Sequence, residues 1–320
     1  MDNKIVLALM QLNGINRKTI LKNFSLKSGI DCNVDNIIYI IKKAGAIDKG
    51  IKPFSRGEIG KAIKETDEII EKSSKQDIKI VTYLDKEYPQ RLKNITDPPT
   101  VLYYKGDISC FNRMNAVAII GTREPTEYGI KIARNLGSSF GKRDYIVVGG
   151  LALGCDTFGH EGCLDEGGKT FAVMPCGLDA IYPAKNKHLA KKILDKGGGL
   201  ISEYPISTRP YKNLFVERDR LQSGLCDGVV VIETGETGGT LHTVGYALEY
   251  KRVVACYSHP EKYLKEPKTF GNQKLIKEGK AFPINNDESL FEFRKKMEFK
   301  YIENKEMVGT QSTIFDFLNQ

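Results

Sequence analysis

Four glycine-containing turns of this 320-residue chain each follow a short apolar run. The first turn, residues 120–125, carries Gly121, Thr122 and Arg123. Glycine lets a backbone approach an anion closely, and amides at a helix start, a hydroxyl and a guanidinium can all donate hydrogen bonds to phosphate. The turn therefore predicts an anion-binding loop. The alternative is a tight turn in which Arg123 pairs with a surface carboxylate.

The second turn, residues 149–156, begins with Gly149 and Gly150, which permit unusual backbone angles and close approach of a ligand. Asp156 and His160 follow at the start of a helix-like run. We interpret Asp156 as a helix cap rather than a catalytic acid, because aspartate is a favoured N-cap residue. His160 is interpreted as a packing residue rather than a ligand.

The remaining two turns complete the set. Residues 176–183 form a glycine turn after the next apolar run, and Gly238, Gly239 and Thr240 precede a helix start. Paired glycines at such a position are typical of an anion nest. A convergent set of four loops is more specific for anion binding than any one of them.

Lys169 lies in a glycine-rich segment that does not fit a nucleotide-binding P-loop. Gly162 and Gly167 have the required separation, but Gly168 stands where the motif needs lysine. The segment also ends a helix and begins a strand, the reverse of the P-loop context. We interpret Gly167 and Gly168 as a helix C-cap and keep Lys169 as a candidate ligand, with a plain surface lysine as the alternative.

A stretch near residue 215 mixes basic, amide and aromatic side chains, which suits a phosphate path with base stacking. Its candidate nucleic-acid ligands are Lys212, Asn213, Phe215, Arg218 and Arg220. In the alternative interpretation the two arginines pair with neighbouring carboxylates on a solvated helix.

Alternating elements must position these loops. Apolar runs predict strands at 116–120, 145–148, 170–174, 199–202, 228–232 and 253–257, and helices are expected at 127–142, 155–166, 186–196 and 239–250. Such alternation predicts an α/β fold with an extended, Rossmann-like, mostly parallel sheet and helices on both faces. Ligands of such sheets bind at the carboxyl ends of the strands.

A small helical domain is expected before the sheet. The predicted division is 1–75 for the helical domain, 76–285 for the Rossmann-like domain and 286–320 for a short tail. The turn at residues 13–16 resembles a helix-hairpin-helix with Asn16 in place of its second glycine, although a plain helical packing module remains the alternative. Strands are also expected near 78–83 and 101–104, and terminal helices near 272–278 and 288–297.

The composition narrows the class of protein. The formal net charge is +8, which suits a polyanionic partner. The seven cysteines form no C-x-x-C pair and the four histidines are dispersed, so neither a metal site nor a cofactor is expected. The absence of a signal peptide and of a long apolar run predicts a cytoplasmic protein without membrane segments.

In chain order, these motifs resemble the DNA-processing protein A (DprA, or Smf) family. The resembling residues are Tyr88, Pro89, Asp97, Pro98 and Pro99 before the core, Val117 to Arg123, Gly149 to Ala152 with Gly154 and Asp156, Gly177 to Asp179, Ile181 to Pro183, Ser202 to Pro205, Phe215, Arg218, Arg220, Ser223 to Leu225, Glu233, and Asn272 to Gly279.

The resemblance implies a non-enzymatic protein that binds single-stranded DNA, usually as a homodimer, and hands strands to a RecA-type recombinase during natural transformation. The family's G-S-R loop corresponds to Gly121, Thr122 and Arg123. The chain departs from the family in three features: Asp219 stands where an asparagine is usual, Gly238 to Thr240 replace Ser-Gly-(Ser/Ala), and the C-terminal winged-helix domain is not expected.

A nucleotide-binding sensor or hydrolase related to the lysine-decarboxylase-like (LOG) phosphoribohydrolases is the alternative function, in signalling or defence. That family carries G-G-x-G-T-x-x-E. Here Gly238, Gly239 and Thr240 lack the further glycine, Thr243 stands at the acidic position, and Glu249 would be a displaced acid.

Overall fold

The computed structural model describes residues 4–24, 26 and 29–299. In this part of the chain one sheet has the order β1-β2-β6-β5-β4-β3-β7-β8-β9. The strands pair in parallel except for β1 with β2 and β2 with β6. Their bounds are β1 Lys79–Thr82, β2 Val101–Lys105, β3 Ala116–Ile120, β4 Ile146–Gly149, β5 Thr170–Met174, β6 Gly199–Ser202, β7 Gly228–Val231, β8 Val253–Tyr257 and β9 Phe282–Ile284. The predicted mostly parallel α/β fold is confirmed.

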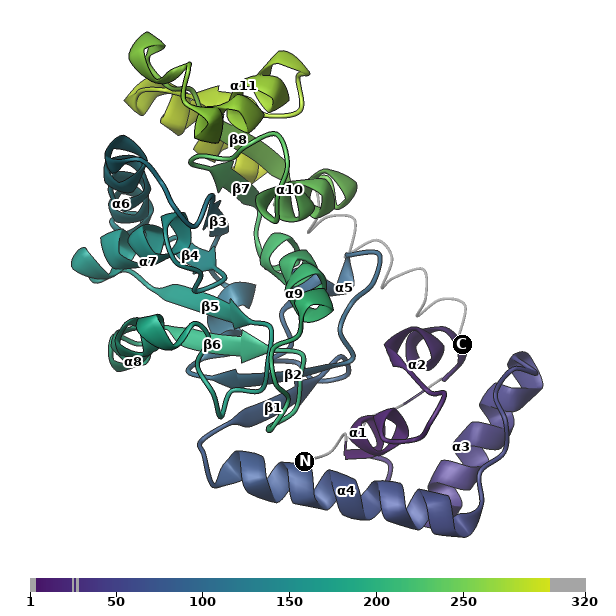
Figure 1. The fold of residues 1–320 in the computed structure, drawn as a ribbon. Helices are drawn as coiled ribbons and strands as arrows, with labels where there is room; N and C mark the ends of the chain where they lie inside the picture. The colour runs from purple at the N-terminus through teal and green to yellow at the C-terminus, as the bar shows by residue number, and fades with distance from the viewer. Residues whose placement is uncertain (1–3, 25, 27–28, 300–320) are drawn as a thin grey trace.

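Helices cover both faces of this sheet (Figure 1). They are α5 Gln90–Lys93, α6 Glu127–Gly141, α7 Cys155–Asp165, α8 Lys187–Asp195, α9 Lys212–Leu225, α10 Thr240–Glu249 and α11 Phe270–Lys277, with short 3-10 turns at Ile108–Asn112, Ala184–Asn186, Glu261–Tyr263 and Pro267–Thr269. Helices α6, α7 and α8 lie on one face, and α9 and α10 lie on the other.

The side chains of β3 show why an all-apolar run forms a central strand. All five are buried. Val117 and Ile119 belong to the core under α6 and α7, whereas Ala116, Ala118 and Ile120 belong to the core under α9 and α10. Successive side chains of a strand point to opposite faces, so a strand covered on both sides needs apolar residues at every position.

The order of the strands creates a crevice beside β3. Strands β4, β5 and β6 follow β3 on one side, and β7 and β8 lie on its other side. The loops after β3 and β7 therefore diverge toward opposite faces. Open α/β sheets bind ligands outside the carboxyl ends of their strands at such a switch point.

The group of helices that precedes the sheet lies against its β1 edge (Figure 1), and we keep the name helical domain for this group. It contains α1 Lys4–Met10, α2 Arg17–Asn23, α3 Val34–Ile47 and α4 Arg56–Ser74. Asn16 caps α2, because its side chain accepts the Thr19 amide at 3.1 Å. This is the position at which a helix-hairpin-helix would carry glycine. Within the described residues, no helix is long and apolar enough to cross a bilayer.

Residues beyond 285 belong in part to the core. Residues 287–299 form a helix whose Leu290, Phe293 and Met297 are buried with side chains of α6 and β7. This burial confirms the helix expected near 288–297, whose regular apolar spacing buries one face, while the division that assigns 286–320 to a tail stays a prediction. The rest of that expected tail, 300–320, lies outside the described residues.

Candidate nucleic-acid interface

Three of the four glycine turns meet at Thr122. Its amide donates to the Glu233 carbonyl after β7 at 2.7 Å, and its carbonyl accepts from the Cys155 amide at the start of α7 at 3.2 Å. Gly154 has a φ of 80°, and a Cβ there would lie 2.4 Å from the Thr122 carbonyl oxygen. Only glycine fits both the backbone angle and this close approach. The predicted convergence of the loops is therefore built by direct backbone contacts.

A cleft of about 750 Å³ opens at this point, between the loops after β3 and β7 and the flank of α9. The predicted ligands that line it are Gly121, Thr122, Arg123, Lys212, Phe215, Arg218, Gly238, Gly239 and Thr240. Gly150 lines a smaller cavity of about 70 Å³ that shares Arg123, Phe215 and Arg218 with the cleft. Sequence positions more than one hundred apart thus form one site.

The mouth of the cleft combines cations with aromatic rings. Arg123 and Lys212 are exposed, and the Arg123 guanidinium lies 5.9 Å from the centroid of the Phe215 ring. Tyr182 packs edge-on against Phe215, with centroids 5.2 Å apart. Such a surface can pair with phosphate oxygens and stack a flat, unpaired base.

Arg218 forms the floor of the cleft rather than its mouth. Its Nη1 donates to the carbonyls of Gly150 at 2.8 Å and Val173 at 2.5 Å, and its Nε donates to Asp219 Oδ1 at 3.1 Å. The residue is only 6% exposed. Its charge reaches the cleft, but most of its donors are already used by the protein. The structure thus gives Arg218 a structural role beside its place in the lining of the cleft, and its direct contact with phosphate stays a prediction.

Two carboxyl groups also face this floor. Burial raises the pKa of Asp156 to about 6, although Arg218 and the Gly150 amide oppose the shift. Burial likewise raises the pKa of Asp219, against the opposing effects of Arg218, His242 and Arg123. Asp156 accepts the Gly150 amide at 2.6 Å and does not cap α7, whose N-cap is Gly154. The predicted capping role of Asp156 is thus wrong.

His160 is a packing residue, as predicted. It is fully buried, and its Nδ1 lies 2.6 Å from Thr170 Oγ1. Burial lowers its pKa to about 3, so the ring is neutral. Gly149 packs directly over it, since a Cβ on Gly149 would lie 2.7 Å from His160 Nε2. Gly149 is therefore needed for packing and does not line the cleft.

Three other candidate ligands lie outside the cleft. Lys169 precedes β5 and acts electrostatically on Asp107 and Cys110, so it lies at the amino end of the strands, opposite the loops. Arg220 is 2% exposed and pairs with Glu203. Asn213 is exposed in the first turn of α9 but is not among the residues that line the cleft.

Several loop amides are already occupied. Gly150 donates to Asp156, as above, and the N-terminus of α6 holds the buried Glu233 carboxylate, which accepts the Thr126 amide at 2.8 Å and hydroxyl at 2.6 Å. The protein itself thus supplies the anion at α6. The start of α10 differs from that of α6 in having no carboxylate or other side chain as its cap. Gly238 and Gly239, which precede this helix, line the cleft.

The cleft is also lined by residues that are not among the ligands predicted from the sequence: Tyr182, Val216, Gln222, His242 and Thr243. Positions 212, 215, 216, 219 and 222 form a stripe with helical spacing, which is the signal that was available. Recognising a 14-residue helix at Lys212–Leu225 would have placed them together. In the alternative interpretation, the pairing of Arg218 with a neighbouring carboxylate is confirmed, since its Nε donates to Asp219. The solvated helix of that interpretation is wrong, because α9 is buried from Arg218 onward.

Fold and site together define the class: a Rossmann-like α/β protein with a cationic and aromatic cleft at the switch point of its sheet. The family model described as DNA recombination-mediator protein A matches residues 79–295. The chain belongs to this family, and the resemblance to the DprA and Smf proteins is confirmed.

Individual relatives support the same family assignment. DNA processing protein DprA of Bacillus subtilis is 36% identical over 228 residues, covering 71% of this chain and 75% of the relative. The structure of DprA from Streptococcus pneumoniae is similar with a TM-score of 0.72 at 27% identity, covering 91% of this chain and 97% of that chain. The structure of DNA processing protein A from Helicobacter pylori, which is described for its single-stranded DNA binding mode, has a TM-score of 0.58 at 28% identity. The match covers 72% of this chain and 96% of that chain.

Proposed function

We propose that this chain binds the backbone of single-stranded DNA in the cleft between β3, β7 and α9, and acts without catalysis in DNA uptake and recombination. The observation that carries the proposal is the mouth of the cleft, where Arg123 and Lys212 adjoin Phe215 and Tyr182. Cations and flat rings together suit a strand whose phosphates and bases are both accessible. Membership of the family and the DNA-binding relative support the same function.

The same proposal includes two protein partners. A RecA-type recombinase would receive the bound strand, and the chain would act as a homodimer. This part rests on family membership. Size-exclusion chromatography with light scattering tests the dimer, and co-precipitation with a RecA-type protein, with and without oligo-dT, tests the transfer partner.

Competition tests the class of ligand. A fluorescein-labelled oligo-dT is titrated with the protein, and the complex is then challenged with unlabelled oligo-dT, duplex DNA of equal length, and a panel of mononucleotides. We expect only the unlabelled single strand to compete efficiently, because backbone contacts along a strand add together. Displacement by a mononucleotide at low concentration would instead support a nucleotide sensor or hydrolase.

Asp219→Asn is expected to tighten binding of oligo-dT, most visibly at low salt. The carboxylate lines the cleft beside Arg218 and opposes an approaching phosphate. Such a repulsion amounts to about 1–4 kcal/mol at surface dielectric before screening. Parallel titrations of the wild type and the variant at low and high salt measure the effect. An equal or weaker affinity of the variant would mean that Asp219 does not oppose DNA.

A further inference from the structure

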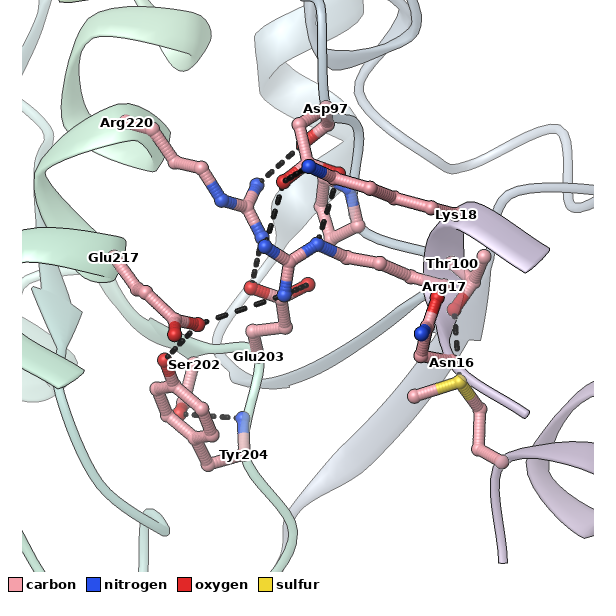
Figure 2. Close-up of polar contacts among 12 residues, drawn as sticks. Asn16, Arg17, Lys18, Asp97, Thr100, Ser202, Glu203, Tyr204, Glu217 and Arg220 are labelled. Atoms are coloured by element: carbon pink, nitrogen blue, oxygen red, sulfur yellow. Dashed lines mark hydrogen bonds and ion pairs between the residues drawn. The ribbon is translucent and has the colours of Figure 1, made fainter. Parts of the chain in front are cut away.

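Helix α9 presents two different faces to its surroundings. Phe215, Arg218 and Asp219 line the cleft, whereas Glu217 and Arg220 take part in a polar network at the junction with the helical domain (Figure 2). A helix is rigid along its length, so both sets of side chains move together. The network is therefore in a position to fix the side chains that line the cleft.

The helical domain enters this network through Arg17, the first residue of α2. Its Nε and Nη2 donate to the two carboxylate oxygens of Asp97 at 2.9 and 2.6 Å. Its Nη1 lies 3.5 Å from Glu217 Oε2 and 3.7 Å from Glu203 Oε1. Figure 2 shows the guanidinium lying among these three carboxylates. Arg17 is not among the residues that line the cleft, so its link to the cleft is indirect.

Arg17 balances the negative charges of the carboxylates in the network. Arg220 pairs with Glu203 and donates to the Asp97 carbonyl at 2.7 Å. Glu217 accepts from the Tyr204 hydroxyl at 3.1 Å, and its ion pair is with Arg17. Burial already raises the pKa of Glu203, and the Glu217 charge raises it further. Without Arg17, these two carboxylates would repel each other with only Arg220 to oppose them, and α9 would lose a fixed point one residue before Arg218.

We propose that Arg17 is a positioning residue for the DNA cleft, acting through Glu217 on α9 and thereby coupling the helical domain to ligand binding. The binding readout of this inference rests on the proposed function. Mutations along packed networks change the coupling between sites by about 0.5–2 kcal/mol, so Arg17→Met is expected to weaken oligo-dT binding by about 2- to 30-fold. The fraction of active protein, given by the stoichiometric end point of the titration, should stay unchanged.

Salt dependence separates positioning from direct contact. A residue that contacts phosphate contributes about −0.7 to the slope of log affinity against log salt. Arg17→Met should give a line parallel to that of the wild type but displaced to weaker affinity. A shallower slope would overturn the proposal, because it would make Arg17 a phosphate ligand.

Lys18→Met is the matched control. Lys18 carries the same charge on the adjacent residue and lies 3.8 Å from Asp97, but its side chain is 73% exposed and its ion pair is with Asp97 rather than Glu217. We expect wild-type affinity from this variant. Equal losses for Lys18→Met and Arg17→Met would overturn the proposal in favour of a general loss of positive charge.

Glu217→Gln removes the negative charge on α9 that pairs with Arg17 and leaves the bidentate Arg17–Asp97 pair in place. It should reproduce the loss of Arg17→Met, and the double variant should be no worse than either single variant. Additive losses would contradict action through Glu217.

Hydrogen exchange of the free protein gives a readout without DNA. Amides of residues 214–219 should exchange faster in Arg17→Met and Glu217→Gln, with those of β3 and α6 unchanged. If the wild type binds no oligo-dT yet these amides lose protection, the proposed function fails and the mechanical link stands. If the wild type binds DNA and neither variant changes affinity or exchange, the positioning role fails alone.

Discussion

Replacing Arg218 with methionine is expected to destabilise the fold by about 3–5 kcal/mol at pH 8. The guanidinium holds the Gly150 and Val173 carbonyls and pairs with Asp219, and Asp156 lies in its field. Removing one partner of a buried pair leaves the remaining charge uncompensated, which costs this much in other proteins. Urea unfolding of the variant and the wild type measures the difference.

The loss should shrink as the pH falls. Without Arg218 the folded-state pKa values of Asp156 and Asp219, already raised by burial, rise further above the unfolded value of about 4. A group with a raised folded pKa stabilises the fold below its unfolded pKa, and this contribution is lost as the pH rises through the folded value. The variant should therefore approach the wild type between pH 8 and pH 5. A loss that is independent of pH would mean that the two carboxylates do not sense Arg218.

Arg123→Ala is expected to weaken binding of oligo-dT by about 1–3 kcal/mol, the scale of a lost charged hydrogen bond. Its unfolding free energy should hardly change, because Arg123 is exposed at the mouth of the cleft. Fluorescence anisotropy with labelled oligo-dT and urea unfolding give the two quantities. Arg218 and Arg123 thus separate a buried structural arginine from an exposed binding arginine in one cleft.

Arg134→Ala is the control for Arg123. Arg134 is also a partly exposed arginine whose guanidinium lies 5.9 Å from a phenylalanine ring, that of Phe158, but it belongs to α6 and is not among the residues that line the cleft. Both variants lose one positive charge. If the two variants weaken binding equally, the effect comes from the net charge of the protein, and Arg123 makes no specific contact with DNA.

The core strands could be predicted because each is a nearly continuous apolar run, as expected for strands that are buried on both faces. The six predicted core strands agree with β3 to β8 within one residue at each end. Strand β9 and the four-residue helix α5 were not predicted, because Phe282–Ile284 and Gln90–Lys93 are too short for a periodic signal. Helix α9 was expected only in the alternative interpretation of Arg218 and Arg220, because its charged residues suggested a solvated surface.

The site was predictable where position in the fold decided the role. The predicted ligands Arg123 and Lys212 lie at the cleft because they adjoin a strand end and a helix start. The predicted ligand Arg220 lies outside the cleft, because its partner Glu203 is 17 residues away and only the packing of α9 brings the two together. The pairing of Arg17 with Asp97 spans 80 residues and leaves no local pattern.

The slope of log affinity against log salt for oligo-dT tests the central claim most directly. Each phosphate neutralised on a single strand contributes about −0.7, so Arg123 and Lys212 together predict a linear slope of about −1.4 or steeper. Arg123→Ala should bind more weakly and with a slope shallower by about 0.7. A flat response of the wild type, or an unchanged slope in Arg123→Ala, would contradict binding of single-stranded DNA through phosphate contacts in this cleft.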